Sequence, residues 1–186
     1  CPGSPKGIGG VLWPRLAADR GDTILHEIAH SNVNDCPTEK LWYWRFDGGS
    51  IWSGPKMISA TDDINYALAV DDIGNKVAVA YSKFAGGYAN VYYVESNNNG
   101  TDWLALVAPN LPVEDTVTTY GAGGNPGSPA QASFWNHLTT TYDRSSELHI
   151  VWDEQRVASE TFDVAIKHFR TGRVAHRTVA LGYWEC

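Results

Sequence analysis

Short apolar stretches alternate with polar turns along most of the chain, at the length and period of β-strands. Three segments align when their glycines are superposed: KLWYWRFDGGSIW at 40–52, VYYVESNNNGTDW at 91–103 and DVAIKHFRTGRVA at 163–175. In each, an aromatic or β-branched run precedes a polar turn that holds Gly49, Gly100 or Gly172, and a new strand follows. This pattern predicts β-hairpins, because alternating strands broken by glycine-containing turns bury one side chain in two.

A second landmark precedes each of these hairpins. Asp19, Asp71 and Asp143 each end a short strand and open a turn, after which an apolar strand begins. The spacing between successive aspartates matches the spacing between successive glycines to within one residue. Since two independent landmarks repeat together, we interpret the chain as an internal repeat of about four strands per unit, the size of a propeller blade.

The predicted fold is therefore all-β, with three blades of four antiparallel strands in a single propeller-like domain. The blades are placed at about 9–58, 59–107 and 134–182, with a Gly/Pro-rich insertion at 108–133. Composition agrees, since the chain has 8 Trp, 9 Tyr and 18 Gly but only 1 Met among 186 residues. That profile favours strands and turns over helices.

The glycine turns resemble the Asp-box (BNR) repeats of sialidase-like β-propellers, whose turn motif is Ser-x-Asp-x-Gly-x-x-Trp. The second turn matches with Asn in place of Asp, the first has Arg in place of Ser, and the third keeps only the glycine. The matching residues are Arg45, Asp47, Gly49 and Trp52, then Ser96, Asn98, Gly100 and Trp103, then Gly172. In such turns the short polar side chain binds turn amides, the glycine supplies a positive φ and the Trp fills the space between strands.

The resemblance implies a structural role for these turns. Catalytic members of the family use an arginine trio, a tyrosine–glutamate pair and an acidic aspartate, and we cannot place these groups in the sequence. We therefore expect a non-catalytic module that binds carbohydrate or protein, or a self-assembling structural subunit. The alternative is one part of a sialidase-like glycoside hydrolase.

Three blades do not close a ring, because propellers typically have four to eight. We expect a homo-oligomer, or additional blades from a longer chain, to cover the open faces. A disulfide between Cys1 and Cys186 is one option, although Cys36 makes the number of cysteines odd.

The string His26-Glu27-Ile28-Ala29-His30 has the spacing of a zinc metalloprotease signature, HExxH. That chemistry needs a helix, on which both histidines share a face and the glutamate serves as base. Here the string aligns with the strand sequence at 148–152, and histidines four apart on a strand lie about 13 Å from each other. We expect a strand and no metal at His26, Glu27 and His30, and the protease is kept as a second alternative.

Candidate ligand-binding side chains precede the Asp landmark in the first and third repeats. An aromatic ring beside a cation or imidazole can stack on a sugar and hydrogen-bond to it. This combination occurs at Trp13 with Arg15 and at Trp135 with His137.

Net charge and the remaining motifs narrow the function further. A formal charge of −7 without a basic stripe argues against nucleic-acid binding, and no apolar stretch is long enough to span a membrane. No phosphate-binding loop occurs, and we expect no cofactor. Asn99 begins a glycosylation sequon, Asn-Gly-Thr. We expect an extracellular or cell-surface location and a glycan as a ligand.

Overall fold

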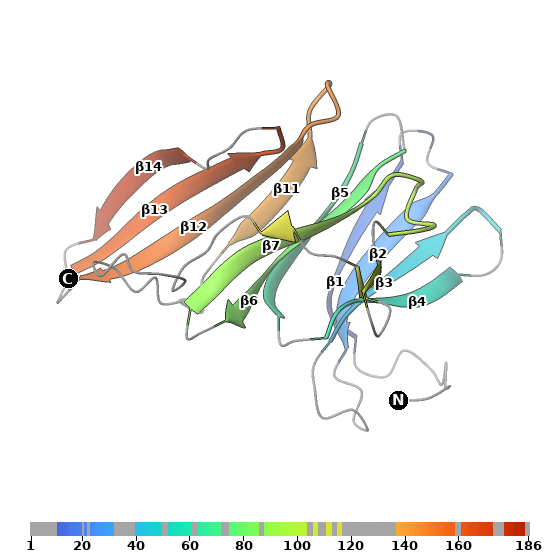
Figure 1. The fold of residues 1–186 in the computed structure, drawn as a ribbon, viewed down its shortest axis with the longest axis horizontal. Coiled ribbons are helices and arrows are strands. Elements are labelled where there is room, and N and C mark those ends of the chain that lie inside the picture. The colour runs from blue at the N-terminus through green and yellow to red at the C-terminus, as the bar shows by residue number, and fades with distance from the viewer. Residues whose placement is uncertain are drawn as a thin grey trace.

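The fold consists of β-sheets joined by turns. A computed structural model describes residues 11–19, 21, 23–31, 40–49, 52–60, 63–71, 75–85, 88–103, 106–107, 111–112, 115–116, 137–158, 161–172 and 177–184. Every helix-or-strand element within these residues is a strand, and twelve of the described strands form three antiparallel sheets of four (Figure 1). The all-β prediction is confirmed.

The first and third sheets are simple meanders, in which each strand pairs with the next one along the chain. The first sheet contains β1 (Val11–Ala18), β2 (Leu25–Ser31), β3 (Lys40–Phe46) and β4 (Trp52–Ser59). The third contains β11 (Leu138–Tyr142), β12 (Leu148–Ala158), β13 (Thr161–Arg170) and β14 (Arg177–Trp184).

The second sheet departs from the predicted pattern at its fourth strand. It contains β5 (Asp63–Val70), β6 (Val77–Ala85) and β7 (Tyr88–Ser96), and its outer strand is the two-residue β10 (Asp115–Thr116). We expected this strand directly after the glycine turn, within 59–107. Instead β8 (Leu106–Val107) pairs with β9 (Leu111–Pro112) in a separate hairpin. The expected insertion at 108–133 therefore supplies the edge of the second sheet.

The three aspartates at the ends of β1, β5 and β11 organise equivalent turns. The Asp19 carboxylate accepts hydrogen bonds from the backbone N–H groups of Thr23 and Ile24 at 2.9 and 3.1 Å. Asp71 accepts one from Asn75 at 2.9 Å, and Asp143 accepts from Ser145 and Glu147 at 2.8 and 3.1 Å. Each aspartate thus fixes the turn into the following strand, which is why this residue recurs at the same place in the repeat.

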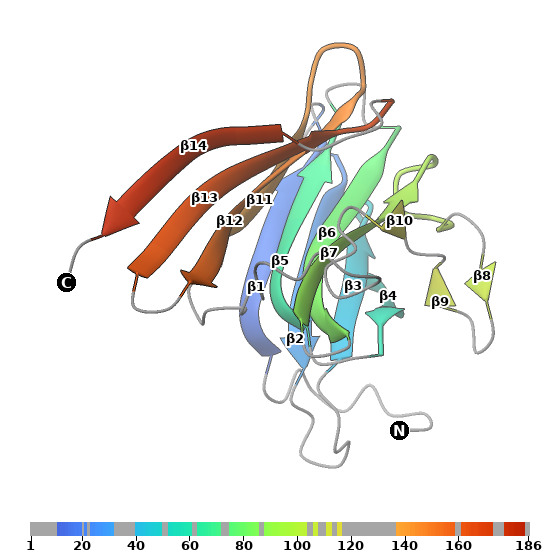
Figure 2. The same cartoon turned by 60° about the vertical axis from the view of Figure 1, so that its left-hand side comes forward.

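The first strands of the three sheets lie next to one another. β1 contacts β5, and β5 contacts β11, so the sheets fan outward from a shared inner row (Figure 2). Because strands alternate the side on which their residues lie, the second sheet has one face toward the first sheet and the other toward the third.

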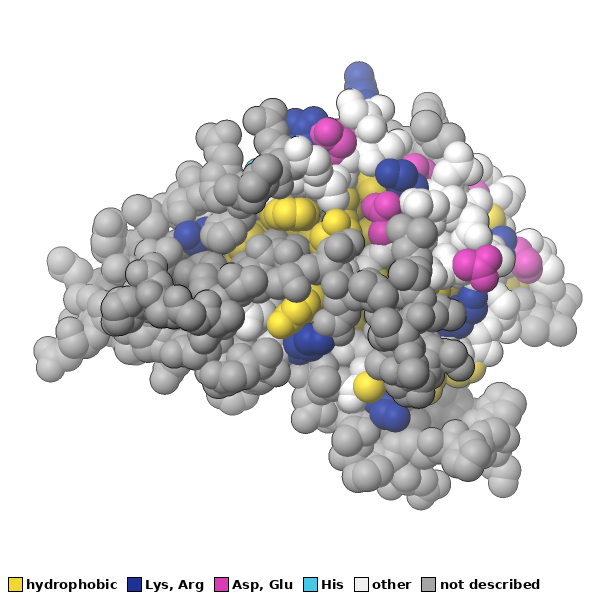
Figure 3. Space-filling view, in the orientation of Figure 1, with side chains coloured by type: hydrophobic (Ala, Val, Ile, Leu, Met, Phe, Trp, Pro, Cys, Tyr) yellow, Lys and Arg dark blue, Asp and Glu magenta, His cyan; other side chains and the backbone are white. Residues whose placement is uncertain are grey.

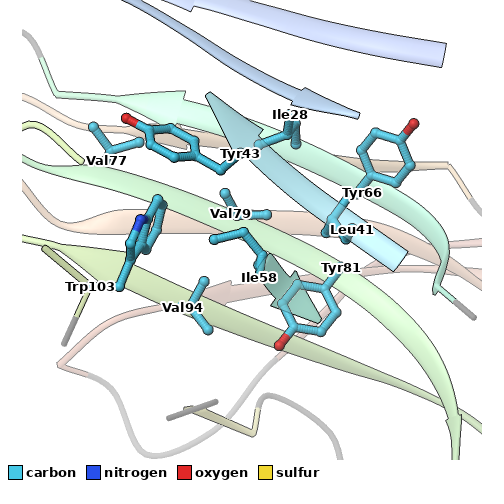
Figure 4. Close-up of a cluster of buried hydrophobic side chains, with 10 residues drawn as sticks. All are labelled: Ile28, Leu41, Tyr43, Ile58, Tyr66, Val77, Val79, Tyr81, Val94 and Trp103. Atoms are coloured by element: carbon cyan, nitrogen blue, oxygen red, sulfur yellow. The ribbon is translucent and has the colours of Figure 1, made fainter. Parts of the chain in front are cut away.

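Two hydrophobic clusters hold the sheets together. The cluster between the first and second sheets contains large side chains, including Ile28, Leu41, Tyr43, Tyr81 and Trp103 (Figure 4). The cluster between the second and third sheets joins small side chains on the second sheet to large ones on the third. Its members are Ala69, Ala78, Ala80, Val91, Leu148, Ile150 and Trp152. Hydrophobic side chains are visible where these two sheets meet, with charged groups beside them (Figure 3).

Candidate functional site

The HExxH string lies on β2, as the sequence predicts. His26 and His30 face the second sheet and are buried, whereas Glu27 between them lies on the opposite face, where it pairs across the ladder with Trp44. The helical arrangement that places two histidines and a glutamate around one zinc ion is therefore absent from β2. Among the described residues, no group of three His, Cys, Asp or Glu side chains is arranged to hold a metal ion.

His26 is part of the packing between two sheets. Its Nδ1 lies 2.7 Å from the hydroxyl oxygen of Tyr43, and the two rings are stacked with centroids 6.0 Å apart. Its Nε2 is buried without a hydrogen-bond partner among the described residues. Burial lowers the pKa of His26 to about 4, and the nearby Arg45 guanidinium lowers it as well. The imidazole is therefore neutral in the folded protein at neutral pH.

This environment predicts a loss of stability in mild acid. The folded-state pKa of about 4 lies below the ordinary histidine pKa of 6.5, so the unfolded chain takes up a proton as the pH falls below 6.5 and the folded chain does not. The stabilisation is fully present above pH 6.5 and declines as the pH falls toward 4. Between about pH 7 and pH 5 we expect the free energy of unfolding to fall by about 2 kcal/mol from this residue alone.

Urea denaturation at a series of pH values measures this effect. His26→Gln removes the titrating group and should flatten the pH dependence in this range, whatever its stability at neutral pH. The matched control is His137→Gln, because the His137 side chain is 89 % exposed. Equal slopes for the wild-type protein and His26→Gln would contradict the assignment.

The second glycine turn is held by its own side chains. The Ser96 hydroxyl accepts a hydrogen bond from the Gly100 N–H at 2.9 Å and donates to the Asn98 carboxamide oxygen at 3.0 Å. The same oxygen accepts the Asp102 N–H at 2.8 Å. Gly100 has a φ of +71°, a region that suits glycine. Asn98 thus occupies the place of the Asp in the motif and makes the contacts that a carboxylate oxygen would make.

This turn also docks on the first sheet. Trp103 is buried and packs edge-on against the Tyr43 ring, with centroids 4.9 Å apart. Arg45 donates to the Thr101 hydroxyl at 3.1 Å, and Lys56 donates to the Thr101 carbonyl oxygen. The turn from Ser96 to Trp103 therefore links the second sheet to the first.

The first and third turns differ from the second. In the first, Gly48 has the positive φ, +78°, and the motif's Gly49 is not among the positive-φ residues, which shifts the turn by one position from the aligned motif. Trp52 is 39 % exposed and packs on Phe46, with centroids 5.4 Å apart, whereas Trp103 is buried between sheets. Asp47 is exposed beside this turn. In the third turn Gly172 has a φ of +79°.

Of the four predicted ligand-binding residues, two have described side chains. Arg15 is exposed on β1, at an irregularity in the strand register. Burial raises the pKa of the Tyr66 hydroxyl on β5, and the positive charge of Arg15 partly offsets that rise. His137 precedes β11, and its backbone N–H and its Nδ1 lie 2.6 and 3.3 Å from the two carboxylate oxygens of Asp153. β5 lies between the strands that carry them. Trp135 and the side chain of Trp13 lie outside the described residues.

The structure gives little information on the remaining predicted sites, the cysteines and the glycosylation sequon. Cys1 and Cys186 lie outside the described residues, so a disulfide between them stays a prediction. Asn99 has a φ of +54° within the second turn, and its carboxamide oxygen is buried without a hydrogen-bond partner among the described residues. In the described part of the chain, no helix has the length and apolar character of a membrane span.

The third sheet carries a polar cluster that the sequence did not predict. His149 Nδ1 lies 2.8 Å from His168 Nε2, and the two rings are stacked with centroids 5.0 Å apart. On its other side, His149 Nε2 lies 3.1 Å from the Asp143 carboxylate, which Arg170 also approaches at 3.6 Å. The hydrogen bond from His149 lowers the pKa of Asp143. The sequence does show alternating polar residues on β12 and β13. That these residues contact one another becomes apparent only from the register between the two strands.

The fold and these sites define an all-β protein of repeated four-stranded sheets, in which the turn from Ser96 to Trp103 packs against the neighbouring sheet. No family model matches the sequence, and no curated protein matches it. Two solved structures of a family PL25 polysaccharide lyase, an ulvan lyase, have a similar fold, and one of them is bound to -[GlcA(1-4)Rha3S]-. Each gives a TM-score of 0.54 at 14 % identity, over 89 % of this chain and 42 % of the lyase chain. The chain thus spans less than half of those structures, and the similarity is one of fold.

Proposed function

We propose that this chain is a carbohydrate-binding segment of a sialidase-like β-propeller, secreted or at the cell surface, whose Asp-box turns are structural. The observation that carries the proposal is the exposed Arg15 on the inner row of strands, in a fold similar to that of a lyase bound to an acidic sugar. The inner row β1–β5–β11 is where three sheets meet, so side chains from several strands can reach one ligand.

The chemistry at this row suits a sugar with hydroxyl or anionic groups. A guanidinium donates several hydrogen bonds in a fixed plane, which matches carboxylate and sulfate groups. Asp153 holds His137 at the start of β11 while leaving its ring accessible. The net charge of −7 opposes a polyanion over most of the surface, so binding of an acidic glycan would depend on such local cations.

Isothermal titration calorimetry with ulvan fragments, and with a neutral glucan for comparison, tests this proposal. Arg15→Ala should weaken binding of the acidic glycan about tenfold, the loss of one charge-assisted hydrogen bond. The matched control is Arg144→Ala, because Arg144 is exposed in the turn that follows β11 and Asp143. Equal affinities for the wild-type protein and Arg15→Ala, or no binding of either glycan, would contradict this site.

A second candidate function is one part of a carbohydrate-active enzyme. The similarity to a polysaccharide lyase favours it, while the 42 % coverage means that more than half of the lyase has no counterpart here. The same preparation should be assayed for unsaturated uronate products from ulvan and for release of sialic acid from a fluorogenic sialoside. Turnover of either would replace the non-catalytic proposal.

A further inference from the structure

The strand register defines which residues of the three sheets are equivalent. In the first sheet, one face of β2 and β3 is formed by His26 opposite Arg45, Ile28 opposite Tyr43 and His30 opposite Leu41. Counting from the Asp turns, the same face of the third sheet is formed by His149 opposite Arg170, Val151 opposite His168 and Asp153 opposite Ile166. In the first sheet this face is directed toward the second sheet, and in the third sheet it is directed away from the second sheet.

The polar contact on this face recurs in both sheets. The His26–Tyr43 contact of 2.7 Å in the first sheet has its equivalent in the His149–His168 contact of 2.8 Å in the third. By strand register the arginine at the place of Arg45 is Arg170, two residues from the position that the glycine alignment of 40–52 with 163–175 assigns. A histidine, its ring partner and an arginine thus occupy matching positions on both faces.

The two faces differ in what covers them. In the first sheet, Leu41 and His26 are 0 % exposed, because the second sheet and its turn with Trp103 pack against them. In the third sheet, Ile166 at the position of Leu41 is 40 % exposed, and the His149 side chain is 24 % exposed. We call this the open face of the third sheet.

The first sheet has the complementary surface. Leu25, Phe46 and Trp52 lie on its other face, since Phe46 pairs across the ladder with both. Trp52 follows the glycine turn at the same sequence distance as Trp103, which covers Tyr43. Trp52 is 39 % exposed, because no neighbouring sheet among the described residues covers it as the first sheet covers Trp103. We call this surface the open face of the first sheet.

We propose that the open face of the third sheet binds the open face of the first sheet in a second copy of this chain. Trp52 of the second copy would cover His168, as Trp103 covers Tyr43 within one chain. A second copy is the occupant because one chain carries both halves of an interface that it already forms internally. Two such contacts, one in each direction, close the assembly without leaving a free face.

The chemistry of the open face agrees with this occupant. A histidine pair and an arginine would be an unusual docking surface for an apolar partner, but the equivalent face of the first sheet already buries His26, and the turn of the second sheet contacts Arg45. There Arg45 donates to Thr101 of the covering turn. The inference concerns assembly and does not depend on the proposed glycan binding.

Sedimentation velocity of the whole chain, with reductant present and over a range of concentrations, tests the contact. The wild-type protein should form a dimer, and Trp52→Ala should weaken it at least about 30-fold, the loss expected for a central aromatic anchor. Ile166→Glu should do the same from the other face. The matched control is Asn97→Ala, because Asn97 is exposed in the turn after β7, belongs to neither open face and should leave the dimer intact.

Mixing the two damaged variants distinguishes this contact from one in which the same face of each chain binds its counterpart. A Trp52→Ala chain keeps the open face of the third sheet, and an Ile166→Glu chain keeps that of the first, so the mixture should form a heterodimer through one intact interface. A dimer in which like faces meet would not be rescued by mixing. A monomer at every concentration, a dimer that reductant dissolves, or a dimer unaffected by either substitution would overturn the proposal. Circular dichroism checks that both variants are folded.

Discussion

Trp103→Ala is expected to lower the free energy of unfolding by about 4 kcal/mol, the range for truncating a large buried aromatic side chain. Trp103 is 5 % exposed and lies edge-on to Tyr43, inside the cluster that joins the first and second sheets. Its loss would leave a cavity at the point where one sheet clamps its neighbour. Urea denaturation, followed by far-ultraviolet circular dichroism, gives the difference directly.

The matched control is Trp52→Ala, which removes the same side chain after the equivalent turn. Because Trp52 is 39 % exposed, the expected loss is about 1 kcal/mol in protein dilute enough to be monomeric. Losses of similar size in the two variants would show that Trp103 is not a buried anchor and would contradict the assigned packing.

Gly100→Ala is expected to cost about 3 kcal/mol or more, for two separate reasons. The φ of +71° costs about 1 kcal/mol for an L-residue with a side chain. In addition, a Cβ at this position would overlap the Tyr43 hydroxyl oxygen, so the turn or the tyrosine must move. Thermal and urea unfolding measure the combined effect.

Two further variants separate the backbone cost from the steric cost. Gly172→Ala has a similar φ of +79°, but its new Cβ would meet only the Glu147 side chain, at an ordinary 3.6 Å. It should show the backbone cost of about 1 kcal/mol alone. Adding Tyr43→Phe to Gly100→Ala removes the hydroxyl and should recover part of the loss. No difference between the two glycine variants would contradict the close approach of Tyr43.

The sequence predicted the sheets better than it predicted their edges. The aspartate and glycine landmarks located the turns because each acts through local geometry, as Asp19 does with Thr23 and Ile24. The edge strand β10 was missed because a two-residue strand has no periodicity, and its pairing with β7 is decided by tertiary packing. The shift from Gly49 to Gly48 in the first turn was missed for a similar reason, since either glycine satisfies the local pattern.

The features of the candidate site that depend on a single segment were predictable, whereas contacts between residues of different strands were not. The strand at His26–His30 followed from the alignment of 25–29 with 148–152. His26 contacts Tyr43 and His149 contacts His168, residues that are 17 and 19 positions apart in the sequence. Predicting these contacts would have required knowledge of the register between the paired strands. Composition and period do not determine that register, because a shift of two residues keeps every side chain on the same face.

The meander topology has a consequence for how the protein folds. The first and third sheets are each made from one continuous segment, so most of their backbone pairing joins residues close in sequence. Such sheets can form as separate cooperative units, with the sheet-to-sheet clusters added afterwards. The alanine-rich surface of the second sheet buries less side chain against the third than Tyr43 and Trp103 bury on the other side. Native-state hydrogen exchange should therefore release the amides of the third sheet first, while the first two sheets stay protected together.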